Sequence, residues 1–161
     1  SLALADIQRL WRAFARLHPA IIAWQREQLV YARKNDCVRC ALCGRAVYFY
    51  GQVEPNKCYN LPIQMGAACI INPAMERIDK QLDWSREGIM FQVHDSLTLD
   101  TDRPLWLYDL VKKEMEAPVK LAGNSATFPI DTKIGTNWGY CVAVKNRDEF
   151  IIEVKKCQQR N

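Results

Sequence analysis

The sequence predicts an α+β fold in which an antiparallel sheet packs on long helices. Apolar residues recur at helical spacing over residues 1–35 and again after residue 102, as in helices with one buried face. Between these regions, residues 88–93 are almost continuously apolar, as in a strand buried on both faces, and residues 96–100 alternate polar and apolar. Only His94 and Asp95 separate the two segments, so we expect a hairpin over residues 88–100.

Length and composition limit the class of protein. The chain has 161 residues, 49% hydrophobic and 25% charged, which suits one domain with one core. No apolar run approaches the roughly 20 residues of a membrane span, and the N-terminus lacks a signal-peptide pattern, so we expect a soluble intracellular protein. A formal net charge of +4 permits contact with a polyanion. The seven cysteines suit reduced, packed thiols better than a disulfide framework.

The first half of the chain is predicted to contain three helices and a hairpin. Residues 1–35 form two helices that meet at His18-Pro19, because proline starts a helix better than it continues one. Residues 37–50, rich in Val, Tyr, Phe and Cys, form a short hairpin. Residues 56–82 form a long helix that Pro73 should kink, because proline removes a backbone hydrogen bond.

Three cysteines lie within the predicted 37–50 hairpin. Cys37, Cys40 and Cys43 recur at every third position, a spacing that suggests zinc or iron-sulfur binding. On a strand, however, Cys40 points away from Cys37 and Cys43, so the three sulfur atoms do not converge. We therefore expect packed thiols here rather than a metal site.

The second half continues with a helix, a strand and an extension. The helix covers residues 102–117 and is capped by Thr101 or Asp102. A strand falls within residues 127–138. The apolar alternation of residues 139–161 predicts a further hairpin, which would cover a sheet edge or form a subunit contact.

Candidate functional residues lie on the 56–82 helix and at the 88–100 hairpin. Asn60 and Gln64 are four residues apart, hence on one helical face. Side-chain amides suit the DNA minor groove, because they can donate to the purine N3 and pyrimidine O2 acceptors of every correct base pair. Asp95 is expected to take the left-handed backbone that a tight turn needs and to expose a hydrated carboxylate that can hold a hard cation.

Taken in order, these segments resemble the C-terminal palm of the family A DNA polymerases, the polymerase I type of bacteria and many bacteriophages. Leu42-Cys43-Gly44-Arg45 resembles the family's Thr-Leu-x-Gly-Arg hairpin, and residues 60–71 resemble its Asn-x-Pro-x-Gln-Gly-x-Ala-Ala helix. Phe91 to Leu97 is similar to its Gln-Val-His-Asp-Glu-Leu motif, and Gly135-x-Asn137-Trp138 to its C-terminal signature. On this resemblance residues 1–138 are part of the palm, and residues 139–161 are an extension outside it.

The resemblance implies DNA-directed DNA synthesis by two-metal phosphoryl transfer. Its cofactor would be two Mg²⁺ ions, and its partners primer-template DNA and deoxynucleoside triphosphates, with no membrane. Asp95 would hold the ions and His94 would lie near the primer terminus. The duplex would be held by Asn60, Gln64 and Arg45. The resemblance also implies the cytoplasm of a bacterial or phage-infected cell.

Several departures from the family pattern affect this interpretation. Ser96 stands where the family usually has Glu, and single-subunit RNA polymerases also carry His-Asp-Ser, so an RNA polymerase-like palm is one alternative. Cys69 stands at a usual Asp position, which predicts weaker duplex binding. The sequence lacks the family's other metal-binding Asp and its basic fingers helix. We therefore expect that the isolated chain does not polymerise and needs a second polymerase segment or chain; a non-catalytic duplex-binding relic is the other alternative.

Overall fold

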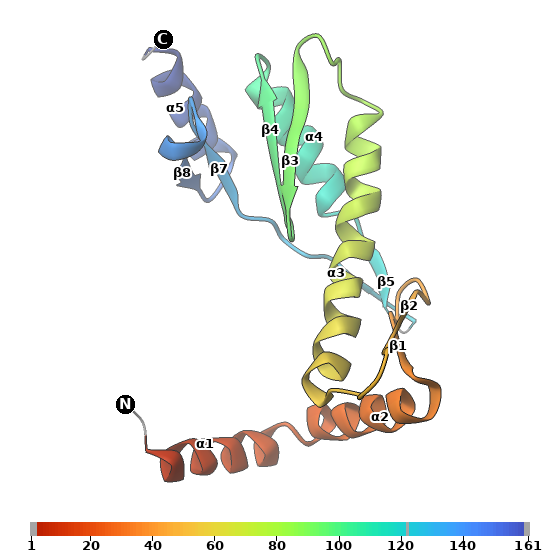
Figure 1. Ribbon diagram of the computed structural model, residues 1–161. Helices are drawn as coiled ribbons and strands as arrows, with labels where there is room; N and C mark the ends of the chain where they lie inside the picture. Colours follow the sequence, from red (N-terminus) through yellow and green to blue (C-terminus); the bar gives the residue numbers. More distant parts are fainter. Residues whose placement is uncertain (1–2, 122, 160–161) are drawn as a thin grey trace. The chain divides into compact units, whose positions relative to one another are not determined.

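The computed structural model describes residues 3–121 and 123–159. Its class is α+β, as predicted, with five α-helices and four two-stranded antiparallel sheets among these residues (Figure 1). The chain divides into two compact units, one up to Gly66 and one from Ala67. Its length predicts one core, but the buried apolar side chains form three clusters, one in the first unit and two in the second.

The first unit contains two helices, a hairpin and the start of a third helix. Helices α1 (Leu4–Leu17) and α2 (Pro19–Asn35) meet at His18, and Pro19 occupies the first turn of α2, where its missing N–H is not needed. Strands β1 (Cys37–Arg39) and β2 (Ala46–Tyr48) pair with Val38 opposite Val47. The core cluster of this unit is built on the buried residues Ala32, Val38 and Cys58.

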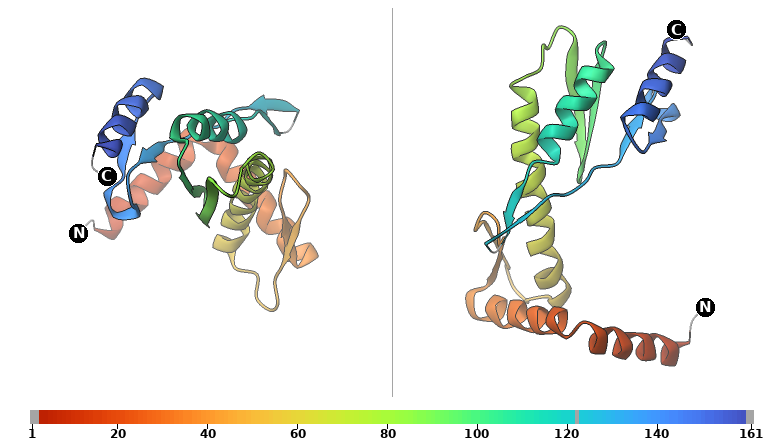
Figure 2. Two further views of the ribbon diagram at one scale, coloured as in Figure 1. Left: turned by 90° about the horizontal axis from the view of Figure 1, so that it is seen from above. Right: turned by 180° about the vertical axis from the view of Figure 1, so that it is seen from behind.

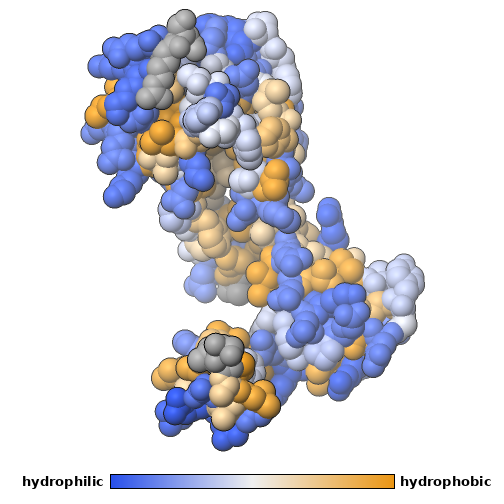
Figure 3. Space-filling view, turned by 60° about the vertical axis from the view of Figure 1, so that its left-hand side comes forward, coloured by the Kyte–Doolittle hydropathy of each residue, from blue (hydrophilic) through white to orange (hydrophobic). Residues whose placement is uncertain are grey.

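The sequence predicts that the apolar face of helix α1 is buried, but in the structure this face is exposed. None of its residues is buried among the described residues. Hydrophobic side chains gather on the surface of α1 (Figure 3). The exposed ones are Leu4, Ile7, Leu10, Trp11, Phe14 and Leu17. Side chains at this spacing form one stripe along a helix, and such a stripe is typical of a helix that packs on a neighbour.

Helix α3 (Pro55–Asp79) is the longest element, with 25 residues. It continues without interruption through Pro62 and Pro73, so neither proline ends the helix. In the first unit its Gly66 faces Leu42 of the β1–β2 turn. No helix in residues 3–121 and 123–159 combines the length and apolar character needed to cross a membrane.

In the second unit, a hairpin packs on two helices (Figures 1 and 2). Strands β3 (Glu87–Val93) and β4 (Ser96–Thr101) lie beside the C-terminal part of α3 and beside α4 (Pro104–Met115). The buried side chains of this cluster are Ile78, Leu107 and Leu110, and Ile89, Leu97 and Leu99 of the sheet pack on them. The helices therefore cover one face of the two-stranded sheet.

The last third of the chain adds two small sheets and a helix. Strands β5 (Val119–Leu121) and β6 (Asn124–Ala126) pair with each other, and β7 (Thr132–Ile134) pairs with β8 (Val142–Val144). A single 3₁₀ turn, η1 (Trp138–Tyr140), precedes β8. The strand expected within residues 127–138 is thus limited to β7.

The hairpin expected over residues 139–161 is wrong. After β8 the chain forms helix α5 (Arg147–Gln158), because Asn146 caps it by accepting a hydrogen bond from the Glu149 N–H at 2.9 Å. Phe150 and Val154, four residues apart on one helical face, pack with Val144 and Tyr108. The extension is therefore a strand and a helix that complete a cluster on α4.

Candidate functional site

The tip of the β3–β4 hairpin holds His94 and Asp95. Val93 pairs with Ser96, so these two residues alone form the loop. Both are exposed. The Ser96 hydroxyl donates to the Val93 carbonyl oxygen at 2.9 Å and so closes the turn. The loop therefore presents an imidazole and a carboxylate to solvent, side by side.

The left-handed residue of this loop is His94, whose φ is 53°. The prediction that Asp95 takes this conformation is wrong. Two-residue hairpin loops need a positive φ at one or both positions, and histidine enters this region more readily than most residues other than glycine. The cost relative to glycine is about 1–2 kcal/mol. Backbone strain of this kind is concentrated at functional sites, where the surrounding structure holds it.

A β-bulge at Met90 decides which side chains face the helices. Ile89 pairs with Leu99 but Phe91 pairs with Thr98, so Met90 is the extra residue on β3. Because cross-strand partners share a face, Gln92, opposite Leu97, lies on the helix side. Its amide Nε2 lies 3.4 Å from Asn72 Oδ1 on α3 and donates to the His94 carbonyl at 3.2 Å. Gln92 thus connects the loop to α3, a role that the sequence alone did not indicate.

The same bulge leaves apolar side chains of β3 on the other face. Met90 is 60% exposed, Phe91 41% and Val93 47%. The Phe91 ring makes an edge contact with Trp138, and their ring centroids lie 4.7 Å apart. The prediction of a strand buried on both faces is therefore wrong for this chain, because its helices cover a single face.

The base of the hairpin is fixed by a buried carboxylate. Glu87 begins β3 with its side chain fully buried, and it accepts hydrogen bonds from Arg103 Nε, from Arg103 Nη2 at 2.7 Å and from the Asp83 N–H at 3.0 Å. The hydrogen bonds from Arg103 hold the pKa of Glu87 below its usual range. The Arg103 guanidinium also stacks over Trp106, 4.3 Å from the ring centroid. This network positions β3 relative to α4, and sequence reasoning missed it because burial of one carboxylate leaves no periodic pattern.

Asp95 is chemically suited to be one ligand of a hard cation. Its carboxylate is exposed at the loop tip, and Mg²⁺ binds through one or two protein carboxylates together with water and substrate phosphates. Ser96 offers a hydroxyl in place of a second carboxylate, and that hydroxyl is engaged with the Val93 carbonyl. This loop therefore offers a single carboxylate as a metal ligand.

The predicted DNA-binding residues lie in the first unit. Asn60 and Gln64 are exposed on one face of α3. Arg45 is exposed in the loop between β1 and β2, directly after Gly44, whose φ of 70° favours glycine. All three are polar groups accessible to a ligand as large as a duplex.

The cysteines of this hairpin do not lie on one continuous strand. Strand β1 ends at Arg39, and a turn follows over residues 41–43. The Sγ atoms of Cys40 and Cys43 lie within 4.8 Å of each other across this turn. The expectation that Cys40 and Cys43 point apart is therefore wrong, because it assumed strand geometry beyond Arg39.

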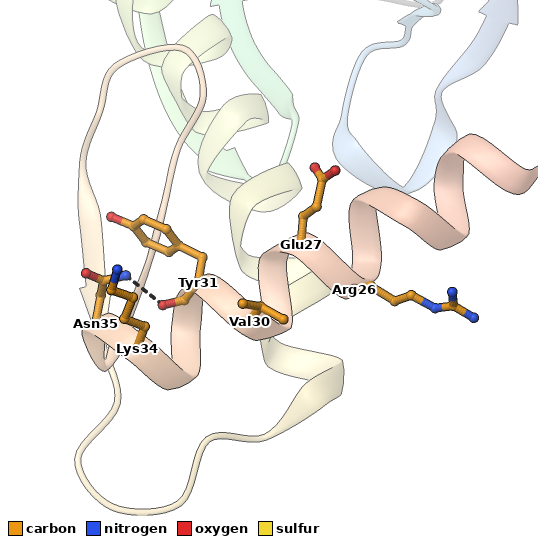
Figure 4. Close-up of a pocket in the computed structure, with 6 residues that line it drawn as sticks. All are labelled: Arg26, Glu27, Val30, Tyr31, Lys34 and Asn35. Carbon is orange, nitrogen blue, oxygen red and sulfur yellow. Dashed lines mark hydrogen bonds between the residues drawn. The ribbon is translucent and has the colours of Figure 1, made fainter.

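A surface hollow runs along α2 (Figure 4). Within it the Asn35 side chain donates to the Tyr31 carbonyl at 2.8 Å. The residues that line it all come from this helix: Arg26, Glu27, Val30, Tyr31, Lys34 and Asn35. The hollow contains none of the predicted site residues.

Comparison with known proteins identifies the family. Residues 3–140 match the model of DNA polymerase family A, and the chain belongs to this family. It is 32% identical to DNA polymerase I of Deinococcus radiodurans over 134 residues, which cover 75% of this chain and 13% of that protein. The chain thus spans a small part of its relative's length. The family match includes the His94-Asp95 loop and ends before β8 and α5.

Proposed function

We propose that this chain is part of the palm of a DNA-directed DNA polymerase and that Asp95 is a ligand of the catalytic Mg²⁺ ions. The observation that carries the proposal is the exposed His94-Asp95 loop of a two-stranded hairpin, in a chain that belongs to family A. Bound Mg²⁺ would activate the primer 3′-hydroxyl and neutralise the charge that develops at the α-phosphate of the incoming nucleotide.

The chain's own residues would position the reaction. Asp95 would hold metal at the loop tip, and His94 would face the primer terminus. Gln92 would keep the loop oriented through its hydrogen bond to the His94 carbonyl, at 3.2 Å. Because this contact fixes backbone rather than substrate, Gln92 is a positioning residue.

Duplex binding would fall to exposed polar groups of the first unit. The amides of Asn60 and Gln64 would donate to minor-groove acceptors of the terminal base pairs, which tests pair geometry without reading sequence. Arg45 would contact a phosphate, where its charge contributes to affinity whatever the base sequence. The exposure of all three side chains supports these roles.

A second polymerase segment or chain would complete the site. One carboxylate cannot hold two hard cations in a productive geometry, so another Asp and the cations that neutralise the triphosphate must be supplied. The exposed apolar face of β3, formed by Met90, Phe91 and Val93, supports this part of the proposal. Apolar side chains clustered on one sheet face are typical of a surface that another polypeptide covers.

Primer extension tests the proposal. The complex recovered from the native source with a tagged chain should extend a primer in Mg²⁺, and Asp95→Asn should lower the rate by at least about 100-fold. Asp100→Asn is the matched control, because Asp100 is also exposed on this hairpin. Equal rates for wild type and Asp95→Asn, or no synthesis by the wild-type complex, would contradict the proposal. The second result would favour a non-catalytic duplex-binding relic.

A further inference from the structure

The turn between β1 and β2 contains a pair of thiols that the proposed polymerase chemistry does not use. Cys40 and Cys43 are separated by Ala41 and Leu42, and their Sγ atoms lie within 4.8 Å of each other. Cys40 is 2% exposed, whereas Cys43 is exposed. One thiol of the pair is therefore held in the protein interior, and the other can be reached by an ion from solvent.

The backbone holds this turn in one shape. The Cys40 N–H donates to the Arg45 carbonyl and the Gly44 N–H donates to the Cys40 carbonyl, both at 2.9 Å. Gly44 has a φ of 70°, and a Cβ there would meet nothing within 4 Å, so conformation rather than space selects glycine. Arg39 Nη1 donates to the Gly44 carbonyl at 2.9 Å. The two sulfur atoms are thus brought together by a turn closed with hydrogen bonds, not by flexible side chains alone.

We propose that Cys40 and Cys43 are two thiolate ligands of a structural Zn²⁺ ion. Two thiolates on a tetrahedral zinc, with Zn–S of about 2.3 Å, have their sulfur atoms about 3.8 Å apart. That separation is compatible with the observed limit of 4.8 Å. The Cys-x-x-Cys spacing is typical of structural zinc sites, and soft thiolates select zinc over magnesium. This ion would therefore be distinct from the hard cations assigned to Asp95.

The ion would fix the turn that carries Arg45. Ala41, Cys43, Gly44 and Arg45 are all exposed, so the turn has little apolar packing of its own. Metal binding supplies folding free energy to such a segment, because a preformed site rarely exists in the unfolded chain. Two thiolates fill half of a tetrahedral shell, and further side chains or water complete it.

Metal analysis of the full chain tests this proposal. Protein purified anaerobically from zinc-replete cells should contain about one zinc per chain, and Cys43→Ser should lower this to below about 0.2. Because residues 41–43 form a turn outside the helices, this substitution should leave the helical signal in circular dichroism unchanged. Cys58→Ala is the matched control: Cys58 is fully buried in the core cluster of the same unit, and its loss should not change the zinc content.

Cobalt binding provides a second, spectroscopic readout of the site. Co²⁺ bound to wild-type protein should show thiolate-to-cobalt charge-transfer absorption, which Cys43→Ser should remove. Three results would overturn the proposal: wild type with neither zinc nor this absorption, zinc content unchanged in Cys43→Ser, or a Cys40–Cys43 disulfide in the anaerobic protein. Iron in place of zinc would overturn the assignment of the ion.

Discussion

Replacing His94 with glycine is predicted to stabilise the fold while impairing DNA synthesis. His94 has a φ of 53°, and glycine relieves the steric cost of this conformation, about 1–2 kcal/mol. Glycine also adds conformational freedom to the unfolded chain, which offsets about 0.5–1 kcal/mol of that gain. The net increase in the free energy of unfolding is therefore about 0.5–1 kcal/mol. Because the imidazole is exposed, its removal leaves no cavity.

Two neighbouring substitutions isolate the cause. His94→Ala removes the same side chain but keeps the steric cost, so it should bring no gain in stability. Asp95→Gly should lower the free energy of unfolding by about 0.5–1 kcal/mol, since Asp95 is not among the described residues with positive φ. Glycine should thus have opposite effects at two adjacent positions.

Urea unfolding of the full chain, followed by circular dichroism, measures these differences. For a chain of 161 residues, 1 kcal/mol corresponds to about 2–4 °C in Tm, so a thermal scan provides a second readout. Primer extension by the native complex should fall in both His94 variants. The reasoning is refuted if His94→Gly is no more stable than His94→Ala, or if Asp95→Gly stabilises as much as His94→Gly.

Three further predictions concern contacts of the second unit. The hydrogen bonds that lower the pKa of Glu87 stabilise the fold above the pKa of the unfolded carboxyl, and this stabilisation is lost as pH falls through the lower pKa of the folded state. The urea midpoint of wild type should therefore be higher than that of Glu87→Gln at pH 7, and the two midpoints should converge at low pH. A difference between the midpoints that does not change with pH would contradict this prediction. Asp109→Asn breaks the exposed bidentate pair with Arg147, both contacts 2.8 Å, and costs about 0.5 kcal/mol. Amide exchange in α5 should rise about twofold at low salt and much less in 1 M salt, where exposed pairs are screened; no change at low salt would argue against the contact. Phe91→Glu should release the second polymerase segment or chain from the native complex without unfolding the hairpin, as a pull-down can show. Lys80→Glu, in the turn directly after α3, should leave the complex intact. An intact Phe91→Glu complex would mean that another surface is used.

The strands around the loop could be predicted from local sequence patterns, but the sheet face to which each side chain points could not. The two-residue spacing between an apolar run and an alternating run defines strands that flank His94 and Asp95. Histidine and aspartate both tolerate the left-handed region, so the sequence does not choose between them. The bulge at Met90 is marked by neither glycine nor proline, and it reverses the side to which Phe91 and Gln92 point.

Two other differences concern residues 139–161 and the cysteines of the β1–β2 turn. The alternation near residues 140–154 suits a hairpin, yet the cap at Asn146 and the four-residue spacing of Phe150 and Val154 suit a helix. Packing of Phe150 on Tyr108, with ring centroids 4.5 Å apart, favours the helix. For Cys40 and Cys43, the sequence could not show that β1 ends at Arg39, because a Cys-rich apolar segment reads equally well as a longer strand.

Cleavage of the polypeptide by bound iron tests the central claim, that Asp95 is a metal ligand of a polymerase site. In the native complex with primer-template DNA, Fe²⁺ replaces Mg²⁺, and added hydrogen peroxide oxidises it to Fe³⁺ with release of hydroxide and a hydroxyl radical, which cuts the chain near the ion. We predict cuts within residues 93–97 that excess Mg²⁺ suppresses and that Asp95→Asn abolishes, while Asp100→Asn leaves them unchanged. Cuts confined to other parts of the chain, or the same cuts in Asp95→Asn, would contradict the assignment of Asp95 as a metal ligand.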